Sequence, residues 1–96
     1  MMALLITTDG EIIDIGCRPS LAQLQDAVGG YIEYVPLSDE ALAITGHTHM
    51  YCNETGKLDG LPINRMATSM IRSTNDIIVG NAVLMTDDDD ESGEEE

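Results

Sequence analysis

The chain of 96 residues carries 18 Asp and Glu against 4 Lys and Arg, which gives a formal net charge of −14. Such a charge excludes direct binding of nucleic acid, because the phosphates would be repelled. Phe and Trp are absent and Tyr occurs 3 times, so the core has to be aliphatic. No apolar run reaches the length of a membrane span and no secretory signal is recognisable, so we expect a cytoplasmic protein without membrane contact.

Acidic residues are concentrated at the C-terminus, where 8 of the 10 residues from 87 to 96 are Asp or Glu. Like charges at this density repel one another and stay hydrated, which predicts a disordered acidic tail over residues 87–96. Residues 1–86 then form a single domain that is still acidic. A domain of this size has much surface for its volume, and we therefore expect a homo-oligomer.

The predicted elements follow from apolar periodicity and turn residues. Asp9-Gly10 supplies the positive φ angles of a hairpin turn, and Ser20 with Gln23 forms a capping box that begins a helix. In chain order we predict strands at residues 3–7 and 11–15, a helix at 20–28, strands at 31–35, 41–45 and 47–52, a helix at 63–71, and a last strand at 77–84 bulged at Gly80. This order, β-β-α-β-β-β-α-β, predicts an α+β domain with a mainly antiparallel sheet and two helices.

The best candidate site is the polar cluster Asn64, Arg65 and Thr68 at the start of the second predicted helix. A helix N-terminus disfavours a cation, so Arg65 in this position favours an anionic ligand that the guanidinium would bind. Asn64 and Thr68 share a helix face and would hydrogen-bond the ligand. The alternative is structural: Asn64 caps the helix, and Arg65 pairs with Asp59 or Glu33.

Tyr31 and Tyr34 are candidates for stacking on a nucleobase beside Gly29-Gly30, where a ligand would approach the backbone. The simpler alternative is that the paired glycines end a helix and need no ligand. No phosphate-binding glycine motif is present in the sequence.

His47, His49 and Cys52 give the pattern His-x-His-x-x-Cys, with Cys17 as a fourth candidate ligand of zinc. On a strand the two histidines share a face, but Cys52 falls on the opposite one. We therefore predict no metal site and no cofactor. No motif marks a carboxylate or cysteine as catalytic, so we predict no catalytic residue and favour a binding protein over an enzyme.

Several segments together carry a resemblance, beginning with Met2-Ala3-Leu4-Leu5-Ile6. The most specific are Val28-Gly29-Gly30-Tyr31-Ile32-Glu33 and Gly60-Leu61-Pro62-Ile63-Asn64-Arg65-Met66-Ala67-Thr68. In this order they resemble a small family of domains of unknown function that is found in phages, plasmids and mobile elements. The resemblance covers nearly all of residues 2–85. It implies a mobile-element setting rather than a known reaction.

Small accessory proteins of phages often act against host immunity, and one strategy withholds cyclic or ADP-ribose-derived nucleotides in oligomeric pockets. By this analogy we expect a phage-type protein of the host-cell cytoplasm that sequesters a small anionic nucleotide-derived immune signal. Arg65 would take the phosphate, Asn64 and Thr68 would read polar edges, and Tyr31 or Tyr34 would stack. The alternative is an acidic interaction protein that inhibits a nucleic-acid-binding host factor by charge mimicry.

Overall fold

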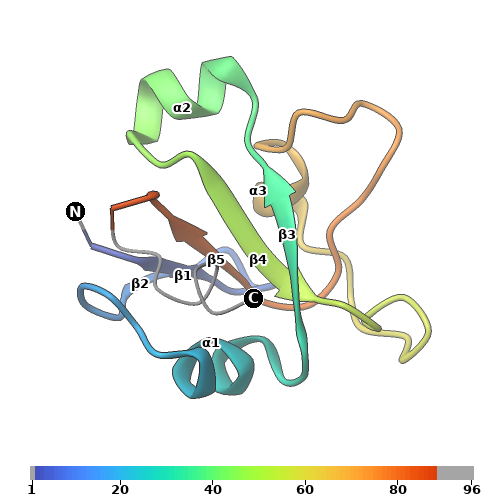
Figure 1. Ribbon diagram of the computed structural model, residues 1–96. Coiled ribbons are helices and arrows are strands. Elements are labelled where there is room, and N and C mark those ends of the chain that lie inside the picture. Colours follow the sequence, from blue (N-terminus) through green and yellow to red (C-terminus); the bar gives the residue numbers. More distant parts are fainter. Residues whose placement is uncertain (1, 89–96) are drawn as a thin grey trace.

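The computed structural model describes residues 2–88 (Figure 1). Its elements, in chain order, are β1 (Leu4–Ile6), β2 (Ile12–Asp14), α1 (Leu21–Val28), β3 (Ile32–Pro36), α2 (Asp39–Thr45), β4 (His49–Asn53), α3 (Arg65–Thr68) and β5 (Ala82–Met85). The strands form one antiparallel sheet in the order β2-β1-β5-β4-β3. The predicted α+β class with an antiparallel sheet is therefore confirmed.

The first two strands form the predicted hairpin. Gly10 takes a φ of 88°, which residues other than glycine rarely adopt. The Thr7 amide donates to the carbonyl of Glu11 over 2.9 Å, which closes the turn, and Leu5 pairs with Ile13 in the ladder. The Asp-Gly signal thus fixed both the turn and the register of the strands.

Helix α1 is capped at both ends by the residues that the sequence predicted. Ser20 accepts a hydrogen bond from the Gln23 amide, and the Gln23 side chain accepts one from the Ser20 amide, which completes the predicted capping box. At the other end Gly29 has a φ of 82° and donates to the carbonyl of Gln25. The helix buries Leu24 and Val28 against the sheet.

The segment predicted as a strand at residues 41–45 belongs instead to helix α2, so this prediction was wrong. Ser38 accepts a hydrogen bond from the Ala41 amide, and Gly46 ends the helix with a φ of 78°. Asp39 and Glu40 in the first turn are favoured by the helix dipole. This N-terminal signal outweighs the β-forming residues near the C-terminal end of the helix.

Helix α3 is shorter than the predicted helix at residues 63–71. It ends at Thr68 because the chain then turns to meet the end of β3: Met70 accepts a hydrogen bond from Ser38, and Ile71 bridges Leu37. Ile63, within the predicted helix, is instead 49% exposed and bridges Val79 as an isolated pair. The last strand accordingly begins at Ala82 rather than at residue 77.

The sheet separates two cores, with α1 covering one face and α2 and α3 the other (Figure 1). Side chains alternate between the faces, so neighbouring residues of β4 enter different cores. The α1 core contains Ala3, Leu24, Val28, Tyr51, Val83 and Met85. The opposite core contains Ile6, Leu37, Ala41, Met50, Cys52, Ala67, Ile71, Ile78, Ala82 and Leu84. Both are aliphatic apart from Tyr51 and the sulfur-containing residues.

Most of the predicted disordered tail, residues 87–96, lies outside the described residues. Of its two described residues, Asp87 has a side chain that is 82% exposed and places a carboxylate oxygen 3.6 Å from Nδ1 of His49. Over the part of the chain that the structure describes, no helix has the length and apolarity needed to cross a membrane.

Candidate functional site

Asn64, predicted to contact a ligand, is fully buried and its carboxamide is used by the fold. Its oxygen accepts a hydrogen bond from the Ala67 amide over 3.0 Å and so caps α3. Its nitrogen donates to the carbonyls of Ile6 and Gly80, each over 3.0 Å. The structural alternative, a capping asparagine, is the one that the geometry shows.

Thr68 is also engaged within the fold. Its hydroxyl donates to the carbonyl of Asn64 over 2.8 Å and accepts from the amide of Ile78 over 2.8 Å. Thr68 therefore ties the end of α3 to the segment that leads into β5, and its hydroxyl has little capacity left for a ligand.

Arg65 is exposed, and no ion pair joins it to another residue in the range 2–88. The pairing with Asp59 or Glu33, which was the structural alternative, is not formed. Helix α3 spans only Arg65–Thr68, so the helix dipole that motivated an anion site here is small. Anion binding by Arg65 stays a prediction, supported by an available guanidinium rather than by a helix terminus.

The two tyrosines lie on or beside the edge strand β3 and differ in their surroundings. Tyr31 is 72% exposed. Tyr34 stacks on His49, with ring centroids 4.6 Å apart, and meets Tyr51 edge-on at 6.0 Å. Gly29 before them is the C-cap of α1, which is the simpler reading of the paired glycines. Stacking of either tyrosine on a ligand stays a prediction.

The histidines and Cys52 do not converge. His49 is buried in the aromatic cluster on the α1 face, whereas Cys52 belongs to the opposite core. The ring Nε2 of His47 lies 2.7 Å from the carbonyl oxygen of Met2. Within residues 2–88, no three His, Cys, Asp or Glu side chains are grouped so that they could hold a metal ion.

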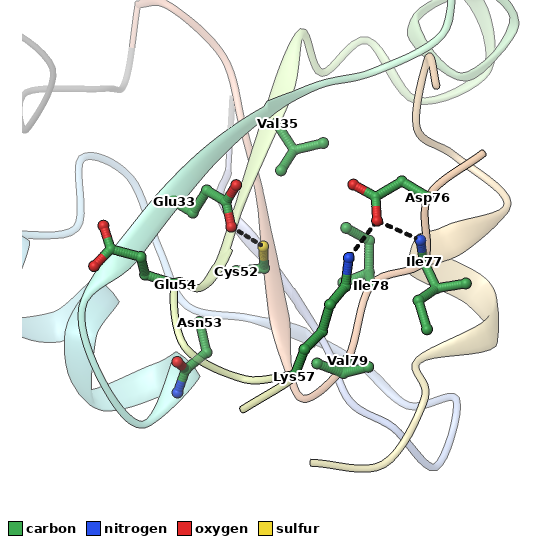
Figure 2. A pocket seen from close by; sticks show the side chains of 10 residues that line it. All are labelled: Glu33, Val35, Cys52, Asn53, Glu54, Lys57, Asp76, Ile77, Ile78 and Val79. Carbon is green, nitrogen blue, oxygen red and sulfur yellow. Dashed lines mark hydrogen bonds and ion pairs between the residues drawn. The ribbon is translucent and has the colours of Figure 1, made fainter. Parts of the chain in front are cut away.

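A pocket of about 250 Å³ lies elsewhere, between strands β3 and β4 and the segment that precedes β5 (Figure 2). None of the five predicted ligand-binding residues lines it. Its walls combine charged groups with apolar side chains from three separate parts of the chain. The lining residues are Glu33, Val35, Cys52, Asn53, Glu54, Lys57, Asp76, Ile77, Ile78 and Val79.

Figure 2 shows Glu33 and Asp76 on opposite sides of the pocket, with the Lys57 side chain reaching across to Asp76. The Asp76 carboxylate also accepts a hydrogen bond from the Ile77 amide over 2.8 Å. The hydrogen bond with Asp76 raises the pKa of Lys57, and the same bond, followed by the Ile77 amide, lowers the pKa of Asp76. Both groups are therefore charged at neutral pH.

Cys52 forms part of the pocket wall and is 5% exposed. Its sulfur lies 4.0 Å from Oε1 of Glu33. Burial, followed by the negative charges of Glu33 and Asp76, raises the pKa of Cys52 to about 11. A thiol that stays protonated at neutral pH is a poor nucleophile, so the pocket lacks the activated cysteine that covalent catalysis needs.

The charge balance of the pocket favours a cationic guest. Three carboxylates line it against one ammonium group, and that ammonium is already paired with Asp76. Glu33 and Glu54 remain as exposed acceptors on the β3–β4 side. Sequence reasoning missed this site because Glu33, Lys57 and Asp76 are distant in sequence and meet only through the pairing of β3 with β4 and the return of the chain toward β5.

The molecule is thus a small α+β domain with an acidic pocket on one side of its sheet. Residues 1–95 match the family model described as "Domain of unknown function (DUF3846)", and the chain belongs to this family. No curated protein and no solved structure matches the chain.

Proposed function

We propose that this member of the family is an acidic interaction protein of phages and related mobile elements. In the host cytoplasm it binds the basic surface of a nucleic-acid-binding host protein and inhibits that protein by charge mimicry. The action is binding, not catalysis.

One observation carries the proposal: the pocket beside β3 and β4 has more carboxylates than cations, and its single ammonium is neutralised within the protein. A basic protein surface presents Lys and Arg side chains arranged to meet phosphates. Carboxylates at the pocket and the net charge of −14 attract that surface and compete with nucleic acid for it.

The test is a competition experiment. A labelled DNA or RNA duplex is bound to each of a panel of purified basic host proteins, and release of the duplex is followed by fluorescence anisotropy as this protein is added. At least one complex should be dissociated at low salt, and the effect should fall as salt rises because exposed charges are screened. If nucleic acid is displaced from no member of the panel at low salt, that result would falsify the proposal.

A full-length variant with the carboxylates of residues 89–96 changed to amides separates two contributions. If the pocket contributes, the variant keeps part of its inhibition, and the remaining inhibition falls further on Glu33→Gln. The matched control is Glu11→Gln, which removes one carboxylate at the exposed β1–β2 turn, outside the pocket.

A second candidate function is favoured by the guanidinium of Arg65, which is exposed and unpaired within the described residues. It is the sequestration of a small anionic nucleotide-derived immune signal. Asn64 and Thr68 are committed to the fold, so the site would need groups from a second copy of the chain. The edge strand β2 exposes Ile12 by 55% and Ile13 by 43%, which supports association between copies.

Calorimetry with cyclic dinucleotides and ADP-ribose derivatives tests this second function. Binding should weaken in Arg65→Ala and persist in Arg72→Ala, which removes the same charge from another exposed position. If no compound of either class gives heat with the wild-type protein, the sequestration hypothesis is abandoned. Sedimentation of the same samples reports whether the binding species is an oligomer.

A further inference from the structure

We propose that the acidic pocket is a binding site for a single primary alkylammonium group, presented by a lysine side chain of a protein partner. The chemistry of the site follows from the pocket alone. The assignment of the group to a protein partner rests on the proposed function.

The size of the pocket sets the class of guest. Sites for drug-sized ligands and cofactors typically measure about 300–1,000 Å³. This pocket holds about 250 Å³, which suits one side chain better than a nucleotide. The pocket is therefore smaller than a nucleotide site would be, and its charge is also of the wrong sign for a nucleotide.

The walls match the two parts of a lysine side chain. Val35, Ile78 and Val79 supply apolar surface for the methylene stem, and Ile78 and Val79 are themselves buried. Carboxylates stand on both sides of the opening, with Glu33 on β3 and Asp76 on the facing segment (Figure 2). A long aliphatic stem with a terminal charge buries its methylenes and keeps its head at polar groups.

The donor set fits an ammonium ion better than a metal ion. The Cys52 thiol is protonated, and the described residues contain no group of three side chains that could coordinate a metal. An ammonium group instead needs separate hydrogen-bond acceptors around it, which Glu33 and Asp76 provide from opposite walls.

Lys57 gives the site a built-in competitor. Its own ammonium already binds Asp76, although its side chain is 59% exposed. Exposed ion pairs are weak and are exchanged readily for equivalent partners. A lysine from a partner would displace Lys57 from Asp76 or would bind Glu33 against the repulsion of Lys57. In both cases removal of the Lys57 charge strengthens binding.

The experiment is a titration of the full-length protein followed by amide chemical shifts. The probe is N-acetyl-lysine N-methylamide, and its apolar analogue with norleucine in place of lysine serves as the uncharged comparison. The lysine probe should shift the amides of Cys52, Lys57 and Ile77, and the norleucine analogue should not. Affinity should fall by about two- to fivefold in Glu33→Gln, the range expected for one exposed ion pair.

Two variants make the result decisive. Lys57→Met keeps an unbranched side chain without charge, and it should bind the probe several-fold more tightly than the wild type. Glu11→Gln makes the same change of net charge as Glu33→Gln outside the pocket, and it should leave the affinity unchanged. Equal weakening by Glu11→Gln and Glu33→Gln would reveal attraction to the whole acidic surface and would overturn the proposal.

A third probe, 1,5-diaminopentane, distinguishes a protein side chain from a free diamine. Shifts with the diamine but none with the lysine probe would overturn the assignment to a protein partner. No shift at the pocket with either amine, in both the wild type and Lys57→Met, would overturn the site itself.

Failure of this inference is distinguishable from failure of the proposed function. Pocket binding of the lysine probe without displacement of nucleic acid from any host protein refutes charge mimicry and leaves the ammonium site in place. The opposite outcome is displacement of nucleic acid that is unchanged in Glu33→Gln and Lys57→Met, with no chemical-shift change at the pocket when the lysine probe is added. That outcome refutes the ammonium site and leaves charge mimicry in place.

Discussion

The side chain of Asn64 donates a hydrogen bond to the backbone carbonyl of Ile6 over 3.0 Å, across 58 positions of sequence. The same amide nitrogen donates to Gly80, and the oxygen caps α3. One buried carboxamide therefore connects the first strand, the third helix and the turn before the last strand. Asn64, which the sequence pattern predicted to bind a ligand, instead holds three parts of the fold together.

We expect Asn64→Ala to lower the free energy of unfolding by about 2–4 kcal/mol, because the helix loses its cap and two buried carbonyls lose their donor. Asn64→Asp should also destabilise the protein, since the carboxylate keeps the cap but faces both carbonyl oxygens. Urea denaturation measures both. An aspartate variant as stable as the wild type would contradict the role of the amide nitrogen.

Arg65→Ala should change the free energy of unfolding by less than about 0.5 kcal/mol, since the side chain is exposed and lacks an ion pair within the described residues. Urea denaturation checks this beside Asn64→Ala. A loss greater than about 1 kcal/mol would show that the guanidinium supports the fold, and its availability for a ligand would then be in doubt.

Gly80→Ala should cost about 1–3 kcal/mol of stability. Gly80 has a φ of 77°, and an added Cβ would lie 2.8 Å from Cδ1 of Leu61. Gly10→Ala is the matched control, because Gly10 has a φ of 88° and an added Cβ there meets nothing within 4 Å. The control isolates the backbone cost, and thermal unfolding should show the larger loss for Gly80→Ala. Equal losses would mean that Leu61 moves aside freely.

Alkylation of Cys52 should be slow at pH 8 and accelerate up to a pH of about 11. In a Cys17→Ser background, its rate at pH 8 should be on the order of 100-fold below that of an ordinary thiol, because the raised pKa leaves little thiolate. Glu33→Gln should move the midpoint of the pH profile downward, because it removes a negative charge that raises this pKa. An unchanged profile in Glu33→Gln would show that the charge of Glu33 does not contribute to this pKa.

The same shift predicts the direction of a pH effect on stability. The Cys52 pKa rises from its ordinary value of 9.0 to about 11, so the folded protein keeps a proton that the unfolded chain releases between these values. The contribution of the Cys52 thiol to the free energy of unfolding is fully present below pH 9 and is lost as the pH rises toward 11. Denaturation at alkaline pH should show a smaller decline in Cys52→Ala; an equal decline would assign it to other groups.

Local signals explain which parts of the fold could be predicted. Gly10 and the Ser20–Gln23 capping box act within a few residues, and both predicted their elements correctly. The signal at Ser38 was equally local but competed with β-forming residues later in the segment, so α2 was predicted as a strand. The length of α3 depends on the hydrogen bond that Ser38 donates to Met70, a tertiary contact that hydrophobic periodicity cannot reveal.

The candidate site was less predictable, because it depends on residues from distant parts of the chain. The conspicuous pattern around Asn64 and Arg65 is explained largely by what Asn64 does inside the protein. Nothing in the sequence around Lys57 or Asp76 marks either residue as part of a site. The two form an ion pair at the pocket only because the tertiary structure brings them together.

The position of β5 has a consequence for synthesis of the chain. This last strand lies between β1 and β4, so it joins the β1–β2 hairpin to the β3–β4 pair. A nascent polypeptide still attached to the ribosome before residues 82–85 emerge holds two halves with no ladder between them. Cooperative folding of the sheet then waits until residues 82–85 have been translated, and a chain truncated just before them lacks the strand that joins the two halves.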